Sequence, residues 1–117
     1  MRLPLHALAH ARSGDKGDVS NVSLIAYRPE AWETLAREAS EARVLAAFRH
    51  LGATRVTRHD LPNLDAFNFV IEGTLGGGVN RSLGIDRHGK TLSFLLLEIE
   101  VEADPALLPA GSPYAPA

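Results

Sequence analysis

The sequence predicts an α+β fold, an open-faced sandwich in which helices cover one side of a mainly antiparallel sheet. Apolar and polar residues alternate with the two-residue period of strands near both ends of the chain, and apolar residues recur at helical spacing before its middle. No stretch of the chain repeats. A chain of 117 residues, 45% of them apolar, is long enough for one domain with its own core.

The N-terminal part predicts two strands separated by a polar loop. Residues 3–9 and 21–27 alternate between two faces, and the second segment is rich in the β-branched and aromatic residues that strands favour. Between them, residues 10–21 are mostly polar or charged and include two glycines.

A helical region follows, from Pro29 to Gly52. Proline suits the first position of a helix, and glycine suits the position just after the last. Ser40 can cap a second helix, so two helical pieces with a bend near Ser40 are favoured over one long helix. The apolar residues at helical spacing are Trp32, Leu35, Ala36, Ala39, Val44, Phe48 and Leu51.

The second half of the chain predicts three more strands. Residues 54–61 form a strand near an edge, residues 82–86 form a short one that leads into a hairpin turn at 86–89, and residues 91–102 form the longest. Residues 64–71 fit both helical and strand spacing, and a short helix is favoured because glycines soon follow.

The domain is expected to end at residue 102. Residues 103–117 contain four prolines and no periodicity, which predicts a flexible tail. The alternative is an extended arm that docks on a neighbouring chain.

Composition excludes several classes of function. The net charge of −2 and the dispersed basic residues argue against a nucleic-acid-binding protein. The absence of cysteine excludes disulfides, thiolate metal sites and a cysteine nucleophile. The apolar run of residues 94–97 is too short to cross a bilayer, and the N-terminus is too polar for a signal peptide. A cytoplasmic protein without membrane contacts is expected.

The polar stretch 10–21 predicts a preformed anion site. Gly14 and Gly17 can adopt positive φ, which would let backbone N–H groups converge on one point. Arg12 offers two parallel donors to a carboxylate or phosphate, and Lys16 offers a point charge. The alternative is a solvated turn in which these cations neutralise nearby aspartates at little gain in stability.

A second glycine-rich stretch, residues 76–78, precedes Asn80 and Arg81. It is either a plain connecting loop or a further backbone surface for a phosphate or an acyl group, and it lacks the pattern of a nucleotide-binding loop. The candidate catalytic residues are Asp15 and Lys16, and the candidate ligand-binding residues are Arg12, Ser13, Gly14, Gly17, Asn21, Asn80 and Arg81.

No metal site and no serine triad are predicted. His6 and His10 lie about 13 Å apart on a regular strand, too far for one ion, although His10 could meet Asp15 or Asp18 across the loop. Ser13 lacks the G-x-S-x-G elbow of a nucleophile.

These motifs together resemble the C-terminal ferredoxin-fold domain of AtuA-like proteins, the acyclic terpene utilisation proteins. The resemblance covers residues 5–101 and rests on residues 11–17, Asn21, 75–79, 81–83, Asp86 and 89–90. It implies a ferredoxin-like fold and a link to the catabolism of acyclic terpenes or branched acids as coenzyme A thioesters. Asp18 stands where many relatives are expected to have Asn, and the large N-terminal domain that normally precedes this one is absent from the sequence.

The leading hypothesis is therefore a small subunit or accessory domain of an AtuA-like enzyme system acting on acyl-CoA thioesters. In it Arg12, Lys16 and the glycine backbone bind an anionic group, which Asp15 and Asn21 position. Coenzyme A would enter only as part of the substrate, and the expected partners are a large AtuA-like subunit and further copies of the chain. The rival hypotheses are a non-catalytic assembly module and an independent small enzyme with a site shared between protomers.

Overall fold

The structure is a computed structural model that describes residues 1–16, 19–73 and 91–116. Its main element is a four-stranded antiparallel sheet with the strand order β2-β3-β5-β4. The strands are β2 (Ala9–Lys16), β3 (Val19–Ala26), β5 (Ala66–Glu72) and β4 (Arg55–Leu61). A second sheet pairs β1 (Arg2–Pro4) with β6 (Glu100–Glu102).

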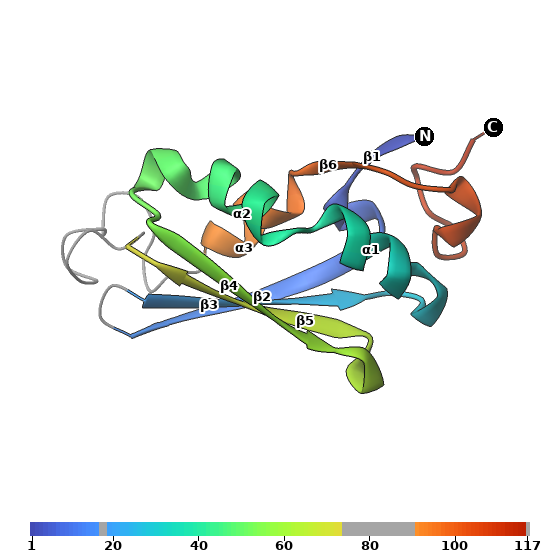
Figure 1. The fold of residues 1–117 in the computed structure, drawn as a ribbon. Coiled ribbons are helices and arrows are strands. Elements are labelled where there is room, and N and C mark those ends of the chain that lie inside the picture. Colours follow the sequence, from blue (N-terminus) through green and yellow to red (C-terminus); the bar gives the residue numbers. More distant parts are fainter. Residues whose placement is uncertain (17–18, 74–90, 117) are drawn as a thin grey trace.

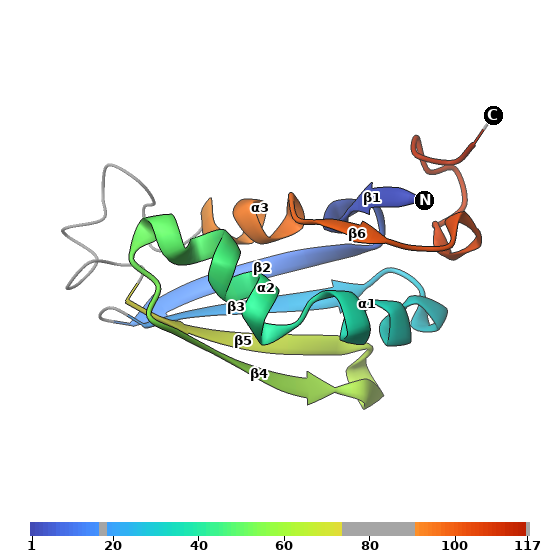
Figure 2. The same ribbon diagram turned by 45° about the horizontal axis from the view of Figure 1, so that its top comes forward.

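Among the described residues, three helices lie on one side of the large sheet, and no described helix or strand covers the other side, which we call the open face (Figures 1 and 2). They are α1 (Trp32–Glu38), α2 (Glu41–Phe48) and α3 (Thr91–Leu97). Short 3-10 turns occupy Leu5–Ala7, Pro29–Ala31, Arg49–Leu51, Pro62–Leu64 and Pro105–Leu107. The predicted α+β open-faced sandwich is confirmed.

The helical region is as predicted. The chain bends between α1 and α2, and the Ser40 hydroxyl accepts a hydrogen bond from the N–H of Arg43 at 3.2 Å, which caps α2. Gly52 ends the region with a φ of +96°, a conformation that glycine adopts without a Cβ clash. The strand predicted over residues 54–61 is also confirmed, as β4.

Two predicted elements are wrong, because a short apolar run fits both the helical and the strand period. Residues 64–71 contain β5, not a helix, since pairing with β3 and β4 on both sides places every second residue in the core. Residues 91–102 are α3 followed by β6, since Leu92 and Leu96, one helical turn apart, are both buried.

The predicted first strand, residues 3–9, is also interrupted. The N–H of Leu5 donates to the carbonyl of Ile99 at 2.8 Å, and a 3-10 turn separates β1 from β2. Leu5 and Leu8 are thereby both buried, which strict alternation does not allow. The predicted strand 82–86 and turn 86–89 lie outside the described residues.

The core lies between the helices and the large sheet. Its largest fully buried side chains are Phe48, Phe67, Phe69, Leu3, Leu5, Leu8, Leu24, Leu35, Ile71, Leu92 and Leu96. On β3 the buried and outward positions alternate, so that Val22 and Leu24 face the helices while Asn21 and Ser23 face the open side. No described helix is long and apolar enough to cross a membrane.

The C-terminal segment packs on the domain, so the prediction of a free tail does not fit its described part. The Arg28 guanidinium donates to the carbonyls of Ala106 and Leu108 at 2.6 and 3.3 Å. The Leu108 side chain is buried, and the Tyr114 hydroxyl lies 3.1 Å from Nε2 of His6.

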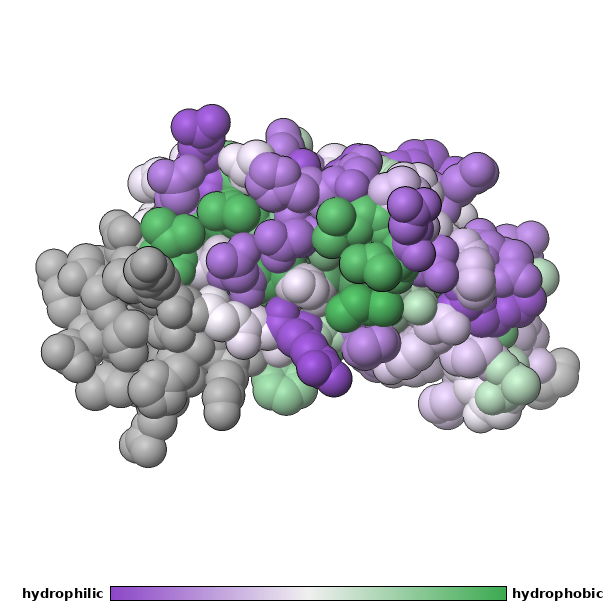
Figure 3. All heavy atoms as spheres, turned by 90° about the horizontal axis from the view of Figure 1, so that it is seen from below, coloured by the Kyte–Doolittle hydropathy of each residue, from purple (hydrophilic) through white to green (hydrophobic). Residues whose placement is uncertain are grey.

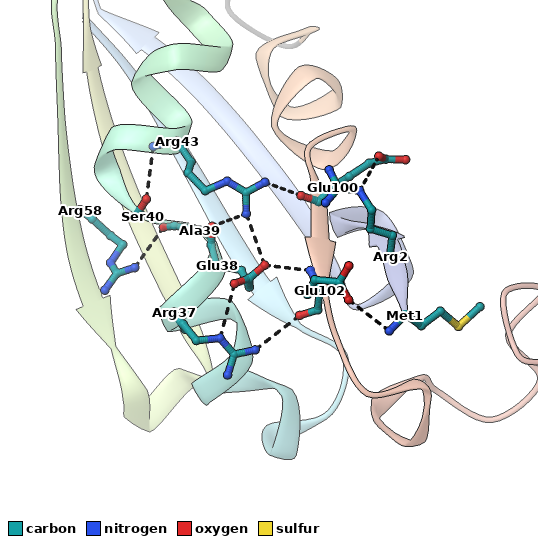
Figure 4. A network of polar contacts seen from close by, with 10 residues as sticks. All are labelled: Met1, Arg2, Arg37, Glu38, Ala39, Ser40, Arg43, Arg58, Glu100 and Glu102. Carbon is teal, nitrogen blue, oxygen red and sulfur yellow. Dashed lines mark hydrogen bonds and ion pairs between the residues drawn. The ribbon is translucent and has the colours of Figure 1, made fainter.

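Glu38, at the end of α1, joins the helices to β6 (Figure 4). Its Oε1 accepts a hydrogen bond from the N–H of Glu102 at 2.8 Å, and Arg37 and Arg43 each lie 3.4 Å from its carboxylate oxygens. The hydrogen bond from Glu102, helped by the two guanidinium groups, lowers the pKa of Glu38 below its ordinary value of 4.5. The folded state therefore favours the charged carboxylate.

This lowered pKa predicts a pH-dependent contribution to stability. Above pH 4.5 the contribution is complete, and it is lost as the pH falls through the pKa of the folded state. Glu38→Gln removes the charge, so it should lower the free energy of unfolding by about 1 kcal/mol at pH 7 and by progressively less in acid. Urea unfolding of both proteins at pH 7 and pH 3 measures this difference. A difference that stays constant with pH would contradict the assigned role of the carboxylate.

Candidate functional site

The stretch predicted to curl into an anion cradle is mostly an extended hairpin. Residues 12–16 belong to β2, which pairs with β3 so that Gly14 lies opposite Asn21 and Lys16 lies opposite Val19. Consecutive residues of a strand point to opposite faces, so Arg12 and Ser13 cannot line one hollow. The predicted loop conformation is wrong for these residues.

The hairpin instead contributes to a row of polar residues on the open face of the sheet. In the strand register Arg12 of β2 lies opposite Ser23 of β3, Ser23 lies opposite Asn68 of β5, and Asn68 lies opposite His59 of β4. We call these four residues the open-face row. It crosses all four strands.

Hydrogen bonds hold the middle of this row in place. The Asn68 amide donates from Nδ2 to Oδ1 of Asn21 at 3.0 Å. The Ser23 hydroxyl donates to Oδ1 of Asn68 at a longer 3.5 Å. These contacts orient the Asn68 amide, and they do not involve Arg12.

Arg12 differs from most arginines of the described chain. It is exposed and makes no hydrogen bond or ion pair with any described residue. By contrast, Arg55 lies 3.8 Å from Glu72, and Arg58 donates to Asp60 at 2.8 Å. Arg49 is exposed and unpaired in the described part as well, but it follows α2, away from the open face. Arg12 is thus a cation on the open face that no described residue engages.

Apolar side chains lie on both sides of the open-face row. Figure 3 views this face and shows two separate apolar areas with polar residues between them. By register, Val19 and Val70 lie on one side of the row and Ile25 and Leu61 on the other. Leu64, beyond the end of β4, is 66% exposed. The face therefore offers a polar centre with apolar flanks.

The remaining candidate residues do not join the open-face row. Ser13 lies opposite the buried Val22 on the helix side, where its hydroxyl is buried without a hydrogen-bond partner among the described residues. Asp15 lies opposite Ser20, and its side chain and that of Lys16 are outside the description. Gly17, Asn80 and Arg81 also lie outside the described residues.

Two hollows of the described surface lie away from the open face. One, of about 420 Å³, is lined by Ala36, Ser40, Glu41, Arg58 and Asp60. Every nitrogen of the Arg58 guanidinium already donates to Asp60 or to carbonyls of Ala36 and Ala39. The other, of about 340 Å³, lies between the N-terminus and Pro105. In the first hollow, Arg58 therefore has a structural role, because its guanidinium nitrogens already donate to the protein and are not left over for a ligand.

Within the described ranges, no group of three or more His, Asp or Glu side chains is placed to hold a metal ion.

The AtuA ferredoxin-like domain family model matches residues 3–102, which is most of the chain. The chain belongs to the AtuA ferredoxin-like domain family. No curated protein and no solved structure matches it significantly. The resemblance noted from the sequence and the ferredoxin-like α+β fold are thus both confirmed.

In this AtuA ferredoxin-like domain, sequence reasoning missed Ser23, Asn68 and His59 as members of the open-face row that begins at Arg12. The helix predicted over residues 64–71 gave no reason to place Asn68 on the same sheet face as Arg12. A strand interpretation of the same residues would have placed Asn68 on the face opposite Phe67 and Phe69. The signal was present in the two-residue alternation of that segment.

Proposed function

We propose that this AtuA ferredoxin-like domain is a small subunit or accessory domain of an AtuA-like enzyme system that acts on acyl-CoA thioesters in acyclic terpene or branched-acid catabolism. Its part in that system is to bind an anionic group of the thioester on the open sheet face. The observation that carries this proposal is the exposed Arg12, whose guanidinium has no partner among the described residues.

The surroundings of Arg12 support an anionic ligand. A guanidinium presents parallel N–H donors that match a phosphate or a carboxylate. Ser23 on the adjacent strand and Asn68 on the strand beyond it supply polar groups that are joined by hydrogen bonds, so a ligand need not order them. The apolar side chains of Val19 and Val70 continue the same face and suit the non-polar part of an acyl-CoA.

Binding of isovaleryl-CoA, measured by isothermal titration calorimetry, tests this proposal. Arg12→Ala removes one charge-assisted contact and should weaken binding about tenfold. Affinity should also fall as the salt concentration rises, because an exposed ion pair is screened.

Arg49→Ala is the matched control, because it also removes an exposed arginine without a described partner. It should change the dissociation constant less than twofold. Equal affinities of the Arg12→Ala protein and the unmodified protein, with both folded by circular dichroism, would refute the proposed role of Arg12.

The alternative is a non-catalytic assembly module, which the exposed apolar residues of the same face favour. Leu61 and Leu64 are 38% and 66% exposed. Such side chains mark contact surfaces when they gather in a patch. In this case the mass in solution should exceed that of one chain, alone or with an AtuA-like large subunit, and Arg12→Ala should leave acyl-CoA binding unchanged.

A further inference from the structure

We infer that the open face holds the adenosine-phosphate end of its ligand, with the flat base stacked on Tyr27 and a phosphate on Arg12. This inference rests on the proposed function and specifies which part of a coenzyme A thioester the domain recognises. The group that this inference identifies, an adenosine phosphate, also occurs in free nucleotides.

The inference begins with an aromatic pair at one end of the open face. The rings of His10 and Tyr27 stack with their centroids 5.4 Å apart and an interplanar angle of 25°. Tyr27 is held beside the sheet because its N–H donates to the carbonyl of Leu8 at 2.9 Å. Its side chain nevertheless remains 49% exposed. The aromatic ring of Tyr27 thus packs on His10 and keeps much of its surface uncovered.

His10 and Tyr27 share with Arg12 a lack of polar partners. Within the described ranges, neither the His10 ring nitrogens nor the Tyr27 hydroxyl makes a hydrogen bond. The situation of His6 is different, since its ring contacts the hydroxyl of Tyr114. Three side chains with hydrogen-bonding groups that no described residue engages therefore follow one another on the open face, from Arg12 in its middle to Tyr27 at one end.

Their spacing fits one small ligand. His10 and Arg12 are two residues apart on β2, on the same face, and therefore about 6.6 Å apart along the strand. Next on that face is Gly14, where an added Cβ would meet no atom within 4 Å. A base stacked beside His10 can thus place a phosphate over Arg12 without a clash at Gly14.

The charges of the chain favour a single nucleotide over a nucleic acid strand. Aromatic rings bind every base by stacking, but proteins that hold a strand also present a basic groove along it. Here the chain has a net charge of −2, and Arg12 is the arginine of the described open face that lacks a partner. One phosphate group close to one base matches this arrangement.

Calorimetric titrations of the full chain with three ligands compare the parts of coenzyme A. Adenosine 3′,5′-bisphosphate keeps the base and the phosphate next to it, 4′-phosphopantetheine lacks the base, and coenzyme A contains both. We expect the bisphosphate to bind within about threefold of coenzyme A, and phosphopantetheine at least tenfold more weakly. Adenosine triphosphate, as a further ligand, tests whether the source is coenzyme A or a free nucleotide.

Tyr27→Leu should weaken binding of the bisphosphate about tenfold, because a leucine side chain does not stack on a base. Tyr114→Leu is the matched control, since Tyr114 is the other tyrosine of the chain and also contacts a histidine. It should change the affinity less than twofold.

The outcomes distinguish the inference from the proposed function. If coenzyme A binding depends on Arg12 but phosphopantetheine binds as well as coenzyme A, the proposed function stands and the adenosine site is refuted. If coenzyme A does not bind at all, both fail. A single-stranded oligonucleotide that binds more tightly than the bisphosphate would also overturn the inference, because the occupant would then be a nucleic acid.

Discussion

Phe67→Ala should lower the free energy of unfolding by about 3–5 kcal/mol, because it removes a fully buried aromatic ring. Phe67 is fully buried on β5, and its ring stacks on Trp32 with centroids 5.0 Å apart and an interplanar angle of 8°. The Arg58 guanidinium lies over the same ring, 5.0 Å from its centroid. Alanine would leave a cavity at the contact between the helices and the sheet.

Urea unfolding followed by circular dichroism measures this loss as a fall in the midpoint with an unchanged slope. Phe94→Ala is the control, because Phe94 is 64% exposed on α3 and should lose less than about 1 kcal/mol. Similar losses of stability for the two variants would contradict the placement of Phe67 in the core and of Phe94 on the surface.

Arg58→Met should lower the free energy of unfolding by about 2–3 kcal/mol. The Arg58 Nη1 donates to the carbonyls of Ala36 and Ala39 at 2.7 and 3.0 Å, near the end of α1. Those carbonyls lose a charged donor in the variant, and Asp60 loses its cation. Methionine keeps much of the apolar stem, so the loss measures the guanidinium group.

Arg55→Met provides a control on the same strand. Arg55 is largely exposed and lies 3.8 Å from Glu72, so its loss should cost at most about 0.5 kcal/mol. The backbone N–H of Arg58 donates to Glu41 at 2.7 Å at the outer edge of β4. Neither substitution removes this hydrogen bond, because it does not involve the side chain of residue 55 or 58. Equal stabilities of the two variants would refute the role of the Arg58 guanidinium.

The parts of the fold that the sequence predicted correctly carry signals that only one structure satisfies. Ser40 and Gly52 are such signals, because a cap and a positive φ mark helix ends. The segments around Phe67 and Leu92 were predicted wrongly because a short apolar run fits a strand and a helix equally well. Pairing with β3 and β4 decides the first segment, and packing on β2 decides the second.

The candidate site could be predicted only in part, for a similar reason. The sequence singled out Arg12 from the density of charge and glycine around it, and Arg12 is indeed exposed without a described partner. It did not show that the stretch is a strand, because Gly14 disfavours strands on local grounds. Only the register of four strands places Ser23, Asn68 and His59 in one row with Arg12.

An NMR titration of the ¹⁵N-labelled protein with coenzyme A tests the central claim most directly, because it reports where a ligand binds. We predict concentration-dependent shifts of the amide signals of His10, Arg12, Ser23 and Asn68, with little change at Arg49 or along α2. Shifts confined to the helix side of the sheet, or no shifts at millimolar coenzyme A, would contradict the claim that the open face is the binding surface.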